Sequence, residues 1–311
     1  MVYGSGNYIY TMGGKCLEEM LPAYTIRLKI PGGGSPEMFT KGTAVRVSSN
    51  PDIWDITYVS DDWSNFFSIL DPFEVIDCNS TGVVNMGGMF NSSEGLTKVC
   101  PMDMSAVTFT SSMFLGCKNL ESLPTMNLQN VTKAWGMFRG CRKLGSVALQ
   151  NTQSITDMAS MFYYCDMLTE ISGLDTSSAT TMEGMFLGAT RLESIPDIDT
   201  ANVKNMYQAF SHCESLRELP AMDTSSVESM GYMCDQCHRL EYIPLLDTSK
   251  VKNMEGAFRH CTGVRSGALA LYQQASSQAN PPSYHSRTFN ECGSMTETGL
   301  EELAQIPSDW K

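Results

Sequence analysis

The sequence has little of what chemistry at a site usually requires. Of its 311 residues only four are His and 18% are charged, and 34 acidic residues outnumber 21 basic ones, for a formal net charge of −13. This balance argues against a nucleic-acid backbone or an anionic membrane as the main partner. No run of about 18 apolar residues is present, so we expect no membrane-spanning helix. The opening residues, MVYGSGNYIY, lack the basic and apolar regions of a signal peptide.

Catalytic motifs are missing as well. The chain has no Gly-x-Ser-x-Gly, no His-Glu-x-x-His and no phosphate loop, since PGGGSPE at 31–37 lacks the required Lys and following helix. We therefore expect no enzyme activity, no cofactor and no metal. What the chain has in excess is Met, with 22 residues, and Cys, with 11.

A 24-residue repeat organises most of the chain. The register is set by Phe90, Phe114, Phe138, Phe162, Phe186, Phe210 and Phe258, with Cys234 in the one vacant place. Most units carry Cys three residues after this position, an aliphatic residue six and nine after, Asp or Asn thirteen after, and Met four before. One such coil cannot bury its own apolar face, so stacked coils would turn each column into a ladder of like side chains.

The predicted fold class is an α/β repeat solenoid. It is a leucine-rich-repeat-like stack of about eight 24-residue coils with a parallel sheet on one face, an N-terminal β cap and a helical C-terminal cap. The strands are expected at 120–124, 192–196, 216–220 and 240–244. The spacing from the Val column through Met to Phe-x-x-Cys predicts short helical turns on the opposite side.

Four domains are predicted: an N-terminal arm at 1–22, a small β-unit at 23–65, the repeats at 66–264 and a C-terminal cap at 265–311. The β-unit has strand patterns at 25–30, 44–49 and 54–60. Phe66 lies 24 residues before Phe90 and would begin the register. In the cap, we expect a helix over 266–279, a helical turn over 297–305 and a last strand motif, LAQIP, at 303–307.

The repeated pattern V-x-x-M-x-x-M-F-x-x-C-x-x-L-x-x-(L/I)-P-x-(M/I/L)-D-T-S is clearest at 203–226 and 227–250. It resembles the BspA-like leucine-rich repeat surface proteins over roughly 66–264. Members of that family are described as surface antigens, adhesins and binders of host proteins. Similar domains are also encoded by bacteriophages and prophages of gut bacteria, often with a lead-in similar to TIRLKI…WDITY. The resemblance brings no catalytic residues.

The resemblance implies a non-enzymatic protein that presents its repeat surface to a protein or glycan. Because no signal peptide is seen at Met1, we expect a virion component in the tail, fibre or head decoration, contacting the host or gut surface. The arm at 1–22, with Tyr3, Tyr8 and Tyr10, would attach it to other virion proteins, and symmetric assembly is expected of a tail protein. The alternative is a secreted bacterial cell-surface adhesin whose signal peptide was removed.

Three groups of side chains invite a chemical interpretation. Cys234 and Cys237 have the spacing of a redox or metal pair, but they also fill the Phe and Cys columns, which we favour. Ladder cysteines one coil apart approach disulfide range, although buried free thiols fit better. The column of Asp and Asn could bind calcium, whereas one Asx turn per coil accounts for the exchange of Asp and Asn.

Two surfaces remain as candidates for binding. The first is an acidic stripe with one aromatic on the predicted strand face, which is either a binding face or a solvated one. Its residues are Glu121, Glu170, Glu193, Arg217, Glu218, Glu241 and Tyr242. The second is an aromatic patch on the opposite side, favouring protein or glycan contact. Its residues are Trp135, Tyr163, Tyr164, Tyr207 and Tyr232, the last two of which could instead be partly buried.

Overall fold

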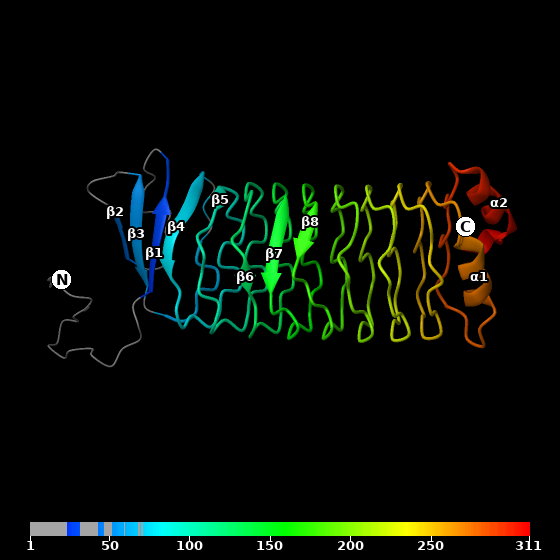
Figure 1. Ribbon diagram of the computed structural model, residues 1–311, viewed down its shortest axis with the longest axis horizontal. Coiled ribbons are helices and arrows are strands. Elements are labelled where there is room, and N and C mark those ends of the chain that lie inside the picture. Colours follow the sequence, from blue (N-terminus) through cyan, green and yellow to red (C-terminus); the bar gives the residue numbers. More distant parts are fainter. Residues whose placement is uncertain (1–23, 32–42, 47–51, 59, 68, 70) are drawn as a thin grey trace.

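The computed structural model describes residues 24–31, 43–46, 52–58, 60–67, 69 and 71–311. The predicted arm at 1–22, with Tyr3, Tyr8 and Tyr10, lies outside the described residues, as do 47–49 of the strand predicted at 44–49. Within the described part, the coils are stacked along one long axis (Figure 1). The N-terminal strands lie at one end of this stack and two short helices lie at the other (Figure 1).

The N-terminal strands form a five-stranded mixed sheet in the order β2-β3-β1-β4-β5. Its strands are β1 (Tyr24–Lys29), β2 (Thr43–Arg46), β3 (Ile53–Tyr58), β4 (Phe73–Asn79) and β5 (Leu96–Lys98). The first four pair antiparallel, whereas β4 and β5 pair parallel. The three strands predicted before residue 60 are present. They alternate as a half-buried sheet requires, with every second residue of β1 buried.

The 24-residue period is visible as parallel backbone contacts between successive coils, from Asn85 with Phe109 to Ser229 with Asn253. Consecutive Phe rings from Phe90 to Phe210 stack nearly parallel, with centroids 5.4 to 5.8 Å apart. The register prediction at the start is wrong by one residue. Phe67, rather than Phe66, stacks on Phe90 at 5.2 Å.

The cysteine column has a role beyond filling space. Each ladder thiol donates a hydrogen bond to the backbone carbonyl of the Phe position in the preceding coil. Cys117 bonds to Phe90, Cys141 to Phe114 and Cys165 to Phe138, with sulfur-to-oxygen distances of 3.1 to 3.2 Å. Each of these carbonyls already accepts a backbone amide of its own coil, such as that of Cys141 at Phe138, so the thiol is a second donor that joins one coil to the next.

The predicted helical turns beside the Phe column are absent from the described coils. Each coil instead has two left-handed residues there, two before and two after the Phe position, such as Gly184 with φ 56° and Gly188 with φ 76° around Phe186. A right-handed helix cannot pass through such residues. The segment is a chain of tight turns with the spacing, but not the backbone, of a helix.

The predicted strand ladder is also mostly missing. Two of the four predicted strands each contain one isolated bridge, Ser122 with Lys98 and Tyr242 with Ser266, and the described residues at 192–196 and 216–220 contain none. A proline ends each of these segments and removes the amide that would continue the ladder. Strands β7 (Ser146–Gln150) and β8 (Glu170–Ser172) form where Ala148 and Ser172 replace this proline. They make a three-stranded parallel sheet with β6 (Met126–Asn127).

The predicted fold class, an α/β repeat solenoid with a parallel sheet on one face and a helical cap, is therefore wrong. The described chain consists of turns and small mixed sheets, with α1 (Ala268–Ser276), α2 (Glu297–Gln305) and the 3-10 turn η2 (Ser308–Trp310) at the end. Both helices lie within the predicted ranges. The strand predicted at 303–307 is wrong, because α2 extends through Gln305. None of the described helices is long and apolar enough to cross a bilayer.

Candidate functional site

The aromatic patch predicted on the turn side is divided into two pairs of rings. Tyr163 and Tyr164 meet edge to face with centroids 4.6 Å apart, and Tyr207 and Tyr232 meet in the same way at 5.9 Å. No ring contact between the two pairs is found in the described residues. The pairs also differ in exposure, and the first is the more open to solvent.

We group the first pair with Trp135, an exposed ring of the preceding coil, and call the three the aromatic platform; no ring contact joins Trp135 to the tyrosines in the described residues. Trp135 is 38% exposed and Tyr164 41% exposed. The guanidinium of Arg139 lies over the Tyr163 ring, 4.2 Å from its centroid. The Tyr164 ring lies against Gly188 of the next coil so closely that a Cβ there would be 2.2 Å from the ring. The two tyrosine rings are therefore held in place before any partner arrives.

Tyr164 also stands where a tyrosine is unfavourable. Its φ is 53°, and the same left-handed position holds Gly140 and Gly188 in the neighbouring coils. A left-handed conformation costs a residue with a Cβ about 1–2 kcal/mol. Other coils also hold residues with a Cβ at this position, such as Ser92 and His212, but Tyr164 places a large ring there that packs against Gly188 and still stays 41% exposed. Strain of this kind at an exposed aromatic points to a role in contact.

Polar contacts fix the second pair of rings, Tyr207 and Tyr232, at the surface of the stack. The Tyr232 hydroxyl donates to Glu255 Oε1 at 2.8 Å, and Arg259 lies 5.2 Å from the centre of its ring. Arg259 also forms a two-point ion pair with Asp235, with nitrogen-to-oxygen distances of 2.9 and 2.7 Å. Tyr207 and Tyr232 are only partly exposed, in agreement with the alternative raised for them.

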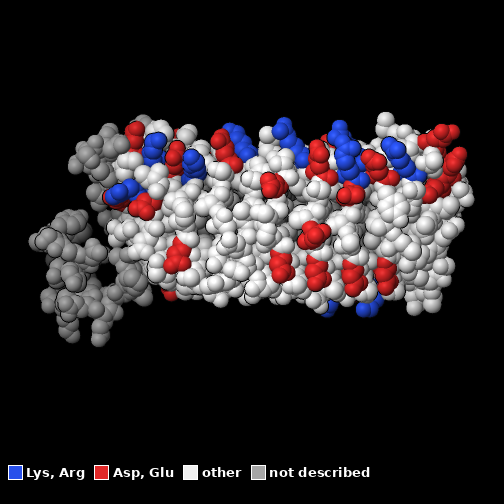
Figure 2. All heavy atoms as spheres, in the orientation of Figure 1, with Lys and Arg blue, Asp and Glu red and all other residues white. Residues whose placement is uncertain are grey.

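The residues of the predicted acidic stripe are all exposed, and Tyr242 is 52% exposed. Basic side chains lie beside part of the stripe, so its negative charge is partly balanced in the structure. Glu241 lies between Arg217, at 3.6 Å, and Arg265, at 3.9 Å. Figure 2 shows acidic and basic side chains intermixed along one edge of the stack. Exposed pairs of this kind contribute about 0–1 kcal/mol each, as a solvated face would.

The column of Asp and Asn forms Asx turns in most coils, but Asn151 instead donates its side-chain amide to Asn127 Oδ1. Asp175 Oδ1 accepts the amide of Ser177, and Asp199 Oδ1 accepts the amide of Ala201, both at 2.9 Å. Hydrogen bonds from the hydroxyl and amide of Ser177 hold the pKa of Asp175 below its usual range. Figure 2 shows a row of acidic side chains along the other edge of the stack. Among the described residues, no three His, Cys, Asp or Glu converge as metal ligands would.

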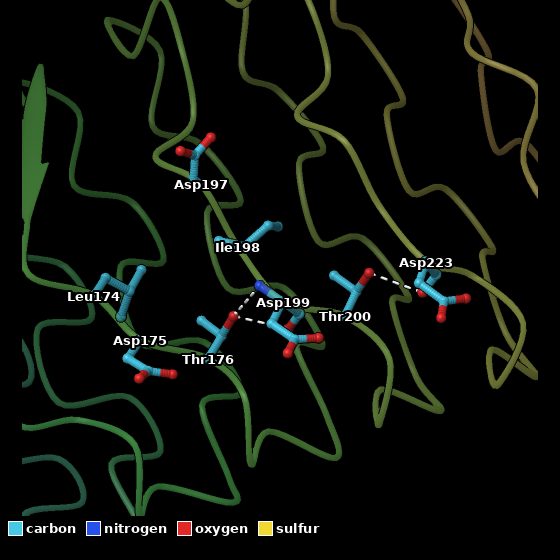
Figure 3. A pocket seen from close by; sticks show the side chains of 8 residues that line it. All are labelled: Leu174, Asp175, Thr176, Asp197, Ile198, Asp199, Thr200 and Asp223. Carbon is cyan, nitrogen blue, oxygen red and sulfur yellow. Dashed lines mark hydrogen bonds between the residues drawn. The ribbon is translucent and has the colours of Figure 1, made fainter.

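A shallow hollow lies over this column (Figure 3). It is lined by Leu174, Asp175, Thr176, Asp197, Ile198, Asp199, Thr200 and Asp223. Beneath the carboxylates, Thr176 donates its hydroxyl to the carbonyl of Asp199 and accepts the Asp199 amide, both at 2.8 Å. The threonines are buried, so this ladder fixes the hollow's wall and leaves only the carboxylates outward.

The Cys234 and Cys237 pair belongs to the core, as favoured from the sequence. Both are fully buried, and Cys237 donates to the carbonyl of Phe210 at 3.1 Å. Burial raises the pKa of the ladder thiols Cys117 and Cys165 well above the usual range. Thiols of this kind stay protonated and unreactive.

Sequence reasoning missed the partners of the platform. Arg139 lies one period before Tyr163 in the same column, so the 24-residue spacing could have indicated their contact. The Asp235–Arg259 ion pair has the same spacing. The sequence-based assignment of the binding residues themselves stays a prediction.

Comparison with known proteins gives one match. The model of a family described as "Mycoplasma protein of unknown function, DUF285" matches residues 36–148, 143–242 and 217–278. The chain belongs to this family. It is a family associated with BspA-like repeat proteins. No curated protein and no solved structure matches the chain.

Proposed function

We propose that this member of the DUF285 family is a non-enzymatic recognition protein. In this proposal, the aromatic platform of Trp135, Tyr163 and Tyr164 contacts a glycan or a protein on a host or gut surface. The observation that carries the proposal is Tyr164, a tyrosine kept at a strained position with its ring exposed. Aromatic rings already fixed in place lose little conformational freedom on binding, which favours affinity.

For the place of action, we propose the particle of a bacteriophage, in its tail, fibre or head decoration. The resemblance of the lead-in and the repeats to phage-encoded domains supports this assignment. Residues 1–22 would join the chain to other virion proteins. The second candidate is a bacterial cell-surface adhesin, which the association of the family with BspA-like proteins favours. Mass spectrometry of purified particles and of cell envelopes from the producing strain separates the two.

The binding proposal can be tested with Tyr164→Gly. Glycine occupies this column in both neighbouring coils, so the variant should fold at least as well as the parent. We expect it to lose about tenfold in affinity for intact host cells or for a glycan-array ligand, the effect of removing one central aromatic contact. Trp135→Ala should act in the same direction.

The matched control is Tyr242→Ala, which removes a tyrosine that is more exposed than Tyr164 from the predicted acidic stripe. Unchanged binding by this control, with loss in Tyr164→Gly, supports the platform. Loss of binding only in Tyr242→Ala would transfer the site to the stripe. If the parent chain binds neither cells nor glycans nor surface proteins, the proposed function is wrong.

A further inference from the structure

Two cysteines outside the ladder lie close together. Cys78 is in β4, Cys100 follows β5, and their sulfur atoms are 3.4 Å apart, with Cys100 donating to Cys78. Both are partly exposed, whereas the other eight described cysteines are buried. They do not belong to the 24-residue columns, because 22 residues separate them.

The backbone on both sides of this pair is already fixed. Before it, β4 and β5 pair in parallel, with Phe73 opposite Leu96. After it, the Ser80 hydroxyl donates to the carbonyl of Asp103 at 3.2 Å and accepts the Asp103 amide at 2.8 Å. A disulfide requires the two sulfur atoms to approach to about 2.05 Å. Side-chain rotation can supply most of that movement, so the coils need not separate.

We propose that Cys78 and Cys100 are a disulfide-forming site, which closes when the protein meets a disulfide oxidant. The bond would join the N-terminal sheet covalently to the coil that follows it. This inference does not depend on the proposed function, because it rests only on the contact between the two thiols.

The chemistry begins at Cys100. When Cys100 loses its proton, the hydrogen bond between the two sulfur atoms reverses and Cys78 donates to the thiolate, which lowers the pKa of Cys100, so this thiol ionises first. The thiolate attacks one sulfur of an oxidant disulfide such as oxidised glutathione, and one glutathione leaves as a thiolate and takes up a proton. Cys78 then loses its proton and attacks the Cys100 sulfur, releasing the second glutathione. Two protein thiols are oxidised to one disulfide while one glutathione disulfide is reduced to two thiols.

The site is selective because its competitors are enclosed. The ladder thiols are fully buried, and each one donates to a backbone carbonyl, so an oxidant cannot reach them while the stack is closed. Burial also raises the pKa of Cys117, the described ladder thiol next along the chain, and suppresses its thiolate. Only the Cys78–Cys100 pair combines access with a neighbouring sulfur in the described part of the chain.

The test uses the full reduced chain incubated with oxidised glutathione, then alkylated in denaturant and digested with trypsin. Cleavage after Lys98 separates the two cysteines into different peptides. We expect these peptides to be recovered as one cross-linked species, two hydrogen atoms lighter than their sum. The second readout is the midpoint of thermal unfolding, which should rise by about 5 °C on oxidation because the unfolded chain is constrained.

Matched variants decide which sulfur is joined. Cys100 and Cys117 fall in the same tryptic peptide, so Cys100→Ser should abolish the cross-link while Cys117→Ser keeps it. Cys78→Ser should abolish it as well. A bond from Cys78 to another cysteine, a bond between two chains, or two free thiols after oxidation would overturn the proposal. A cross-link without a rise in the midpoint would refute the claim that it joins the sheet to the stack.

Discussion

The Phe stack differs sharply between its two ends. From Phe67 to Phe210 each ring has its neighbour in register, at centroid distances of 5.2 to 5.8 Å. At Cys234 the stack is interrupted, and Phe258 has a ring neighbour only on its far side, Phe289, at 6.1 Å. The surface over the interrupted part carries cross-coil polar contacts, between Asp235 and Arg259 and between Tyr232 and Glu255.

This comparison indicates two ways of holding consecutive coils together. Where the rings are continuous, ring stacking adds to the hydrogen bonds that join consecutive coils, and this part of the surface carries the aromatic platform. Where a thiol replaces a ring, directional contacts at the surface fix the same register. Asp235 is only 4% exposed, so its ion pair is close enough to the core to contribute.

The largest expected effect tests the continuous part of the stack. Phe162→Ala should lower the free energy of unfolding by about 3–5 kcal/mol, because the ring is fully buried between two others. Phe258→Ala should cost about 0.5–1.5 kcal/mol less, since it loses one ring contact fewer. Urea unfolding of both variants measures the difference. Equal losses would show that ring stacking adds nothing to burial.

The next effect tests the interrupted part. Asp235→Ala should lower the free energy of unfolding by about 1–3 kcal/mol, because Arg259 keeps a partly buried charge without its partner. The control is Asp166→Ala, whose partner Arg142 is 3.8 Å away and more than half exposed, and which should cost below about 1 kcal/mol. Similar losses in the two variants would remove the proposed distinction.

A smaller effect is expected in the cysteine column. Cys165→Ala should lower the free energy of unfolding by at most about 1 kcal/mol, because the carbonyl of Phe138 loses one of two donors and keeps the amide of Cys141. Ala189 occupies this column naturally, so the coil should still fold. Thermal unfolding provides the measurement. A loss above about 3 kcal/mol would assign the thiol a packing role that exceeds its hydrogen bond.

The smallest effect concerns pH. Hydrogen bonds from the hydroxyl and amide of Ser249 lower the pKa of Asp247 in the folded chain below its unfolded value of about 3.9. Its stabilising contribution is therefore present above about pH 4 and is lost as the pH falls through the folded pKa.

Asp247→Asn keeps the Asx turn, as Asn127 does, and should change stability at pH 7 by less than about 0.5 kcal/mol. Acid unfolding should then begin at lower pH, or be less steep, in the variant than in the parent. An identical acid transition in both chains would contradict the assignment.

The sequence predicted which residues are buried far better than it predicted the backbone. Leu120 and Leu144, from the column six residues after the Phe position, are fully buried as the repeat requires. The turns were mistaken for helices because left-handed positions are filled by Gly in some coils and by His212 or Tyr164 in others, which hides the signal. The proline after each expected strand was interpreted as its end, although it prevents the ladder from forming.

The candidate site was predictable only in part. Aromatic side chains near the Phe column could be named from the repeat, but their division into an exposed platform and a tied-down pair could not. That division depends on which side chain lies one coil away, such as Gly188 under Tyr164 or Glu255 beside Tyr232. The Cys78–Cys100 contact was missed because a spacing of 22 falls outside the period.

The buried threonine ladder has a consequence for the length of the molecule. Thr152, Thr176, Thr200 and Thr224 each donate to a carbonyl 23 residues ahead, and Thr248 instead accepts from Gln278, beyond α1. The hydrogen bonds of these four threonine hydroxyls therefore repeat from one coil to the next with the same donor, acceptor and spacing. Excision of one whole period, such as 176–199, would re-form the same bonds one step shorter. Loss or gain of complete 24-residue periods would therefore change the length of the stack while the N-terminal sheet and the C-terminal helices stay unchanged.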